Sequence, residues 1–501
     1  MTAGYVGVET EYGVAVTGPS EVHAVRASSL VVEAWRGTGT ARVRWDHTDE
    51  HPDRDARAPE VRPGRPDTVI GDAGSPSTVL TNGARLYVDH AHPEYATPEC
   101  TNARDLVVWD VAGERIMAAA GRRAEELLPP GHAVHLHKNN TDGKGAAYGT
   151  HENYLVARRV PFGLLTRHLL PMFVSRVALT GAGRVGSDAE PAAEFQLSQR
   201  ADFFEAEVGL ETTVRRPLMN TRDEPHADPD RWRRLHVING DANLCEVATL
   251  IKVGALLLVL RAVEASALPE PLALADPLAA FRSVSRDTSL RAPLELVDGR
   301  RMTALDIQES YAEACADLVA RDGAREGDEL VLRWWTRLIE LGRDDPGRLA
   351  GTVDWATKLA LIEAFRARHG LGPTDDRVRM VDLQYHDVRR DRGLHHRLAA
   401  AGRVVRLTTD EEVERAVVEP PADTRAWFRG RCIARFPEAV VAAGWDSVVL
   451  DTGGEALVRI PLDEPSRGTR ERVGDLLDAA TDAVDLVARL GGSPALPGQL
   501  A

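Results

Sequence analysis

The chain has 501 residues, of which 43% are hydrophobic and 27% charged, and its formal net charge is −15. A chain this long exceeds what one compact core usually holds, so we expect two or more domains. The acidic balance disfavours nonspecific attraction to DNA or to anionic lipid. We therefore expect neither nucleic acid nor a membrane among its partners.

Sequence patterns also indicate the compartment. The most apolar stretch is far shorter than the ~18 residues needed to span a bilayer, and the first residues lack the pattern of a signal peptide. The four cysteines are scattered and form no CxxC pair. This spacing argues against a disulfide framework and against a thiolate zinc site. We expect a soluble, cytoplasmic protein.

The N-terminal part combines predicted strands with a long polar insertion. Residues 5–14 and 85–89 have the period-two pattern of strands, and residues 21–36 resemble a helix. Residues 37–77 between them are rich in Asp, Arg, Pro and Gly and poor in apolar side chains. Such a segment cannot bury enough surface to order itself, and loops this long are usually functional or disordered. We predict a mobile insertion of mixed charge.

The rest of the chain alternates strands with helices and then becomes mainly helical from about residue 270 to 420. The predicted strands are 133–139, 148–158, 233–239, 445–450 and 456–462. The predicted helices include 105–127, 162–180, 246–267, 304–321 and 329–341. Pro420 and Pro421 mark a boundary. This order predicts an α+β fold, with an antiparallel sheet backed by helices in residues 1–420 and a small α+β domain in residues 421–501.

The first strand carries two acidic residues on one face. Glu9 and Glu11 are two residues apart, so their carboxylates emerge on the same side. Adjacent carboxylates repel each other unless a cation or another partner lies between them. Taken alone, the pair is better explained as a solvated strand face.

The second strand separates polar from apolar side chains. Arg85, Tyr87 and Asp89 share one face, while Leu86 and Val88 belong to the other. Arginine can bind a phosphate with two hydrogen bonds, and an aspartate can act as base or nucleophile. A structural face of salt bridges explains this pattern equally well.

Nearby residues extend the polar pattern. Glu94 and Glu99 bring the number of clustered carboxylates to four, which favours magnesium or manganese over zinc. Later strands alternate in the same way, at His135, His137 and Asn139, at His151 and Asn153, and at Arg234 and His236. One histidine alone is usually structural, but several such strands predict a concave polar surface for a nucleotide and a metal. The charged segment 220–228 is an open candidate for substrate or phosphate contact.

Six motifs together resemble the Pup ligase and Pup deamidase/depupylase family of the actinobacterial proteasome pathway, which is related in fold to glutamine synthetase. They are GVETEYGV, NGARLYVDHAHPEYATPEC, HKNNTDGKGAAYGTHENYL, FQLSQRADFFEAEVGLETT, NTRDEPHADPDRWRRLHVINGDAN and PPADTRAWFRGR. They cover nearly the whole chain, and motifs of this length are highly specific.

The resemblance implies a curved antiparallel sheet that cradles ATP, closed at the nucleotide end by the small C-terminal domain. It assigns the essential aspartate to Asp89. It implies that Mg²⁺ is held by Glu9, Tyr87 and Glu94, with Glu11 and His236 as weaker candidates. It also implies that Arg85, Thr97 and Trp445 contact ATP.

Two features favour the deamidase/depupylase branch over the ligase branch. The chain has the 37–77 insertion, which ligases lack, and it has one residue fewer before HPEY. The pair Ala96–Thr97 points the other way, because many deamidases have two serines there. We therefore expect an enzyme that deamidates the C-terminal glutamine of Pup and cleaves Pup from lysines of pupylated proteins. The alternatives are a Pup–protein ligase, a non-catalytic Pup-binding protein and a small-molecule glutamate–amine ligase.

The expected mechanism leaves the role of Asp89 open. It either attacks the substrate carbonyl to give an acyl intermediate or activates a water molecule as a base. Pup is expected to be acidic and disordered and to fold along a complementary groove. The arginine-rich stretches 231–234 and 425–431 are candidates for lining that groove, although solvated helix faces are the more ordinary explanation.

Overall fold

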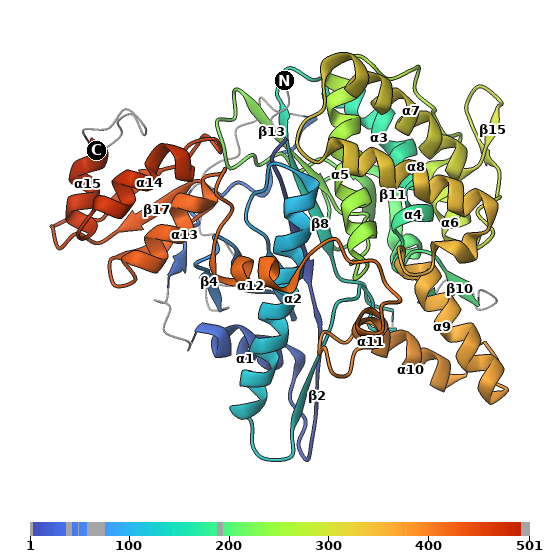
Figure 1. Ribbon diagram of the computed structural model, residues 1–501, viewed down its shortest axis with the longest axis horizontal. Coiled ribbons are helices and arrows are strands. Elements are labelled where there is room, and N and C mark those ends of the chain that lie inside the picture. Colours follow the sequence, from blue (N-terminus) through green and yellow to red (C-terminus); the bar gives the residue numbers. More distant parts are fainter. Residues whose placement is uncertain are drawn as a thin grey trace.

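Strands from distant parts of the chain form one six-stranded sheet in the order β13–β8–β1–β6–β5–β4, in which every neighbouring pair is antiparallel. The structure, a computed structural model (Figure 1), describes residues 4–36, 43–48, 50–57, 76–143, 145–187, 194–373 and 375–491. The strands of this sheet are β1 (Val6–Glu11), β4 (Ser77–Val79), β5 (Arg85–Asp89), β6 (His92–Ala96), β8 (Thr150–Ala157) and β13 (Trp232–Val237). The predicted α+β class and antiparallel sheet are confirmed.

The predicted strand 5–14 is in fact two strands that belong to different sheets. After β1 the chain bends, and β2 (Gly13–Thr17) pairs instead with β7 (Ala133–His137). The close approach of Tyr148 requires glycine at position 13, because a Cβ there would overlap the Tyr148 hydroxyl. His135 lies on this separate ribbon and hydrogen-bonds Thr17. The prediction that His135 and His137 extend the polar surface of the main sheet is therefore wrong.

Two helices cover the apolar face of the main sheet. α1 (Ala24–Arg36) packs on β5 and β6, and α2 (Ala103–Glu126) packs on β1 and β6. Asn102 caps α2 by accepting a 2.9 Å hydrogen bond from the Asp105 amide. Leu86 and Val88, which alternate with the polar residues of β5, are buried on this side. The period-two pattern therefore separates the core face from a polar face.

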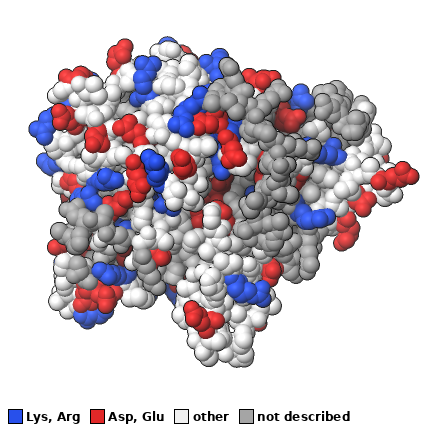
Figure 2. All heavy atoms as spheres, turned by 180° about the vertical axis from the view of Figure 1, so that it is seen from behind, with Lys and Arg blue, Asp and Glu red and all other residues white. Residues whose placement is uncertain are grey.

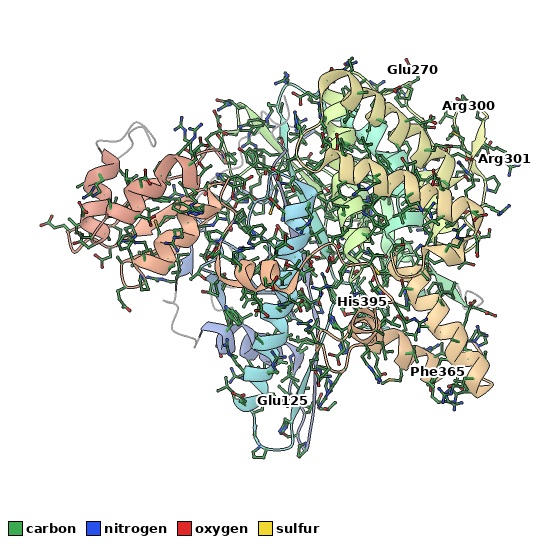
Figure 3. All side chains as sticks on the ribbon, in the orientation of Figure 1. Glu125, Glu270, Arg300, Arg301, Phe365 and His395 are labelled. Atoms are coloured by element: carbon green, nitrogen blue, oxygen red, sulfur yellow. The ribbon has the colours of Figure 1, made fainter. Side chains whose placement is uncertain are left out.

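A helical half forms the largest hydrophobic core and centres on α5 (Glu246–Glu264), which is buried nearly all round. Around it lie α3 (Phe162–Ser175), α4 (Val177–Thr180), α6 (Pro277–Arg286), α7 (Ala304–Asp322), α8 (Asp328–Asp344), α9 (Asp354–His369), α10 (Asp376–Tyr385) and α11 (Leu394–Ala400). Short strands complete it: β9 (Arg184–Val185), β10 (Phe195–Gln196), β11 (Phe204–Gly209), β12 (Arg216–Asn220), β14 (Leu294–Glu295) and β15 (Arg301–Met302). Arg300 and Arg301 mark the outer rim (Figure 3). No helix in the described part of the chain is long and apolar enough to cross a bilayer.

The C-terminal unit incorporates a strand from the N-terminal insertion. Its sheet has the order β18–β17–β16–β3 and comprises β16 (Val440–Ala443), β17 (Ser447–Leu450), β18 (Val458–Pro461) and β3 (Arg44–Trp45). The helices α13 (Ala426–Arg435), α14 (Arg470–Ala479) and α15 (Ala483–Gly491) belong to it, while α12 (Asp410–Val418) packs on α2. Val43 and Trp45 are buried in its core. The prediction that the whole insertion is mobile is therefore wrong for residues 43–48, because the C-terminal sheet orders them. Residues 58–75 lie outside the described residues.

Candidate active site

The polar face of the main sheet gathers the side chains that alternation predicts. Residues directly opposite each other in an antiparallel pair point to the same face. Glu9 lies opposite His151 on β8, and Glu11 lies opposite Glu94 on β6. Glu94 in turn lies opposite Tyr87. Glu9, Glu11, Tyr87 and Glu94 are therefore brought onto one surface by strand register.

The first cluster on this face consists of Glu9, His151 and His236, which offer one ligand atom each within 4.8 Å of one another. Asn153 donates a 2.9 Å hydrogen bond to Glu9, and the His151 Nδ1 atom lies 3.5 Å from the other carboxylate oxygen. Burial raises the pKa of Glu9, but His151, Arg234 and Arg222 outweigh it and lower the pKa to about 2. Glu9 is therefore a carboxylate at neutral pH.

His236 gives the clearest indication that this cluster is built to bind a ligand. Both of its ring nitrogens are buried and have no hydrogen-bond partner among the described residues. Burial, together with Arg234 and His151, lowers its pKa well below the usual value, so the ring is neutral. A buried neutral imidazole with free nitrogens is suited to bind a cation. The residues present fit a metal ion.

The second cluster consists of Glu11, Asp89 and Glu94, whose ligand atoms also lie within 4.8 Å of one another. Burial and the neighbouring Asp89, Glu11 and Glu9 raise the pKa of Glu94 well above its usual range. Burial and then Glu94 also raise the pKa of Tyr87, so its phenol stays protonated. A bound divalent cation would relieve this repulsion, and an all-oxygen donor set suits Mg²⁺ or Mn²⁺.

Asp89 occupies the open edge of this cluster. It ends β5 at a two-residue turn, in which His90 adopts a left-handed conformation with φ of 52°. The Asp89 side chain is 41% exposed, and the His90 Nδ1 atom lies 2.9 Å from its carboxylate. Burial raises the pKa of Asp89, but the hydrogen bond and charge of His90 outweigh it, so the pKa is lowered. Asp89 is thus an ionised carboxylate that a substrate can reach.

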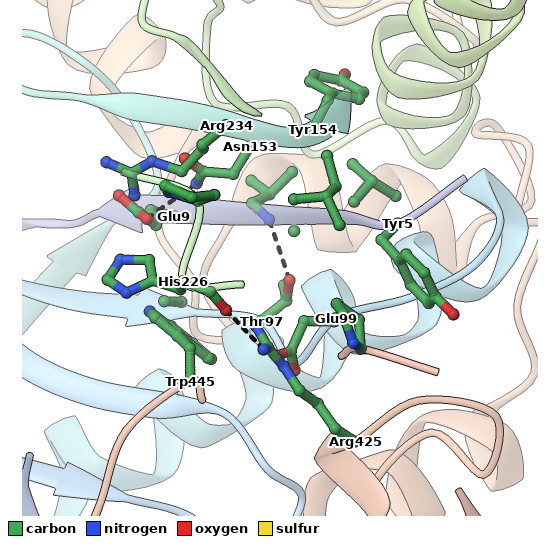
Figure 4. A pocket seen from close by; sticks show the side chains of 17 residues that line it. Tyr5, Glu9, Thr97, Glu99, Asn153, Tyr154, His226, Arg234, Arg425 and Trp445 are labelled. Atoms are coloured by element: carbon green, nitrogen blue, oxygen red, sulfur yellow. Dashed lines mark hydrogen bonds and ion pairs between the residues drawn. The ribbon is translucent and has the colours of Figure 1, made fainter. Parts of the chain in front are cut away.

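An open pocket begins at Glu9 and runs along the sheet toward Tyr5. Gly7 and Ala96 give it a flat floor, and Trp445 from the C-terminal unit is part of its wall. Figure 4 shows Glu9, Arg234, His226 and Trp445 gathered at one end and Tyr5 at the other. Thr97 lines the pocket and accepts a 3.0 Å hydrogen bond from the Val8 amide. A flat apolar floor facing an indole is suited to a planar base.

Arg85 lies beside this pocket but is not among the residues that line it. Its guanidinium lies 4.0 Å from the ring centres of both Trp45 and Tyr87. Trp45 also contacts Trp445, with ring centres 5.2 Å apart. Sequence reasoning missed Trp45, although an indole in an otherwise polar insertion is a signal that could have identified it.

Three groups of sequence-predicted residues have structural roles instead. Glu99 is not part of either metal-binding cluster, because Arg425 and Arg429 hold it at 2.7 and 2.5 Å. Both arginines are buried, and Arg425 also lines the pocket.

In segment 220–228, Asp223 forms ion pairs with Arg158 and Arg233, whereas Pro225 and His226 line the pocket. Arg231 is exposed and pairs with Glu464.

Comparison with known proteins places these features in a family. A sequence profile described as Pup-ligase protein matches residues 5–449. A depupylase from Acidothermus cellulolyticus is 51% identical to this chain, covering 97% of it and 99% of the relative. A Pup deamidase/depupylase from Mycolicibacterium smegmatis is 48% identical and covers the same shares of the two chains.

Solved structures give the same result. The complex between the prokaryotic ubiquitin-like protein Pup and its ligase PafA contains a chain that matches with a TM-score of 0.80 and 32% identity, covering 95% of this chain and 90% of the other. PafA in complex with ADP matches with a TM-score of 0.73 and 36% identity, covering 80% and 89%.

Proposed function

Because this chain belongs to the Pup-ligase family, we propose that it is an ATP- and Mg²⁺-dependent amidohydrolase that deamidates the C-terminal glutamine of Pup and cleaves the Pup–lysine isopeptide bond. One observation carries this proposal. Asp89 is an ionised, accessible carboxylate within 4.8 Å of Glu11 and Glu94, beside a pocket suited to a nucleotide base. Identity to the depupylase relatives is 48–51% over 97% of this chain, against 41–45% over 82% of it to Pup–protein ligases.

The donor groups divide between metal and nucleotide. Glu9, Tyr87 and Glu94 hold the metal, with Glu11 and His236 as further ligands. Arg85, Thr97 and Trp445 would contact ATP. When bound, the metal–nucleotide pair supplies positive charge and a phosphate group that stabilise a developing oxyanion and position the reactants. The ADP complex of the PafA ligase supports nucleotide binding at this fold.

Asp89 carries out the chemical step on the substrate carboxamide. As nucleophile, its carboxylate oxygen attacks the carbonyl carbon, and the C–N bond breaks as ammonia or the lysine amine leaves with a proton taken from solvent. Water then hydrolyses the anhydride intermediate, which regenerates the Asp89 carboxylate and returns a proton to solvent. As base, it takes a proton from the attacking water molecule and passes it to the leaving amine. His90 holds the carboxylate in its ionised state in either case. Mass spectrometry of trapped enzyme, with an adduct mapped to Asp89, separates the two routes.

The proposed partners are Pup and pupylated proteins, which connects the enzyme to the proteasome pathway, and we place the reaction in the cytoplasm. The Pup complex of the PafA ligase supports the first point, and the four free, buried cysteines fit the second. Basic and acidic side chains are interspersed on the face in Figure 2, so that face carries no continuous basic groove among the described residues.

The test is to incubate the enzyme with glutamine-ended Pup, ATP and Mg²⁺ and to follow Pup mass and ADP release together. We expect conversion of the terminal amide to the acid without matching ADP. Conjugation of glutamate-ended Pup to lysine with stoichiometric ADP would instead establish the ligase activity that Ala96–Thr97 favours. Tight Pup binding without turnover would make the protein a non-catalytic binder, and turnover on small glutamate amides alone would make it a small-molecule enzyme.

A further inference from the structure

Arg429 on α13 joins three segments that are far apart in the sequence. Its guanidinium is fully buried and donates to the Glu99 carboxylate at 2.5 and 3.3 Å and to the Gly83 carbonyl at 2.8 and 3.1 Å. It also donates a 2.9 Å hydrogen bond to the Trp445 carbonyl and lies 5.0 Å from the centre of the indole ring. These five hydrogen bonds therefore connect Arg429 to Gly83 and Glu99 of the main domain and to Trp445 of the C-terminal unit.

Arg425, one turn earlier on the same helix, forms the second half of this arrangement. It donates to Glu99 at 2.7 Å, to the His226 carbonyl at 2.6 Å and to the Leu462 carbonyl at 2.7 Å. Glu99, His226 and Trp445 all line the pocket (Figure 4). The two arginines and Glu99, here called the arginine clamp, thus fix three separate parts of the pocket wall relative to each other.

The clamp is not the only attachment of the C-terminal unit. Glu464 forms a 2.6 Å ion pair with Arg231, and Thr424 donates a 2.9 Å hydrogen bond to the Glu99 carbonyl. Loss of Arg429 therefore leaves the unit attached but removes the hydrogen bond that fixes the Trp445 backbone. Trp445 lies between β16 and β17, so no strand pairing fixes its position.

We propose that Arg429 is a positioning residue for nucleotide binding, which holds the Trp445 indole at the base-binding end of the pocket and uses Glu99 as its anchor. This inference rests on the proposed function, because it requires a nucleotide in that pocket. Bases stack on aromatic rings, so a displaced indole should weaken nucleotide binding about tenfold, which corresponds to about 1.4 kcal/mol. The chemistry at Asp89 involves no contact with the clamp.

The experiment compares Arg429→Ala, Arg429→Lys and the control Arg435→Ala by calorimetric titration with Mg–ATP and by steady-state kinetics on Pup. Arg435 is on the same helix but pairs with Asp478 and the Ala480 carbonyl, away from the pocket. We expect Arg429→Ala to raise both the ATP dissociation constant and the KM for ATP about tenfold. At saturating ATP, kcat for Pup hydrolysis should stay within about threefold of wild type. Arg435→Ala should bind ATP as wild type does. Lysine keeps the charge beside Glu99 but cannot hydrogen-bond all three acceptors at once. Arg429→Lys should therefore fold, yet bind ATP more weakly than wild type.

A double-mutant cycle with Trp445→Ala decides whether the effect passes through the indole. We expect the second substitution to add little to the first, because both remove the same stacking contact. Wild-type ATP affinity in Arg429→Lys, or full additivity with Trp445→Ala, overturns the proposal. If the wild-type protein binds ATP but does not hydrolyse Pup amides, the proposed function is contradicted and the positioning role of Arg429 is not. A wild-type protein that binds no ATP overturns both.

Discussion

Glu11 lies directly opposite Glu94 across the β1–β6 pair, so two buried carboxylates share one register position on the polar face. Asp89 is close enough to add a third negative charge. Like charges opposite each other destabilise a sheet, and this cost persists only where a cation offsets it. Replacing one of these carboxylates should therefore change the stability of the fold in opposite directions with and without bound metal.

Glu94→Gln should stabilise the metal-free protein by about 1 kcal/mol or more at pH values above the raised pKa of Glu94, where it removes a buried like charge. The same change should abolish most of the stabilisation that Mg²⁺ or Mn²⁺ gives the wild type, since a ligand is lost. Thermal unfolding with chelator and with a metal series measures both effects. Glu99→Gln is the matched control, which should be destabilised under both conditions. Lower stability of metal-free Glu94→Gln contradicts the metal assignment.

Asp89→Asn should keep the fold and ATP binding yet lose Pup hydrolysis by about a hundredfold or more, as expected for a group that takes part in the chemical step. Activity is measured by Pup mass, and ATP binding by calorimetry. Asp298→Asn, in an exposed turn where Asp298 pairs with Arg300, serves as the control and should leave both unchanged. Near-wild-type turnover in Asp89→Asn removes this residue from the mechanism.

The arginine clamp should make part of the stability acid-sensitive. Burial raises the pKa of Glu99, but Arg429 and Arg425 outweigh it and lower the pKa to about 2. A depressed carboxyl pKa stabilises the fold above the unfolded value near 4.5, and this contribution is lost as the pH falls toward 2. The full effect is at most about 3 kcal/mol. The difference in unfolding free energy between wild type and Glu99→Gln, measured by denaturant titration from pH 6 to 3.5, should shrink with acid. A difference that does not depend on pH rejects this assignment.

Two deletions in the insertion should have different effects. Removing 37–77 takes Val43 and Trp45 out of the C-terminal core and β3 off its sheet, so that unit should lose several kcal/mol of stability. Removing 58–75 alone spares every described contact of 43–57 and should leave the melting temperature nearly unchanged. Long polar loops are usually functional or disordered, and we hypothesise that this insertion gates the site. The shorter deletion should then alter the kinetics of ATP-dependent Pup hydrolysis. Unchanged kinetics in that variant rejects gating.

The sequence by itself determined which side chains share a strand face. Period-two alternation placed Arg85, Tyr87 and Asp89 together and opposite Leu86 and Val88, because successive side chains of a strand must point to opposite sides. It also determined that Glu9 and Glu11 share one face. This local geometry depends only on backbone chirality and spacing, so it could be predicted without any knowledge of neighbouring strands.

Only the tertiary structure decided which strands meet. Register across β1, β6 and β5 placed Glu11, Glu94 and Asp89 in one cluster, whereas a bend at Gly13 sent His135 and His137 to another sheet. Glu99 shows the same limit, since its sequence neighbours suggest a metal ligand but two arginines more than 300 residues away neutralise it. Such pairings depend on long-range packing, which no local pattern encodes.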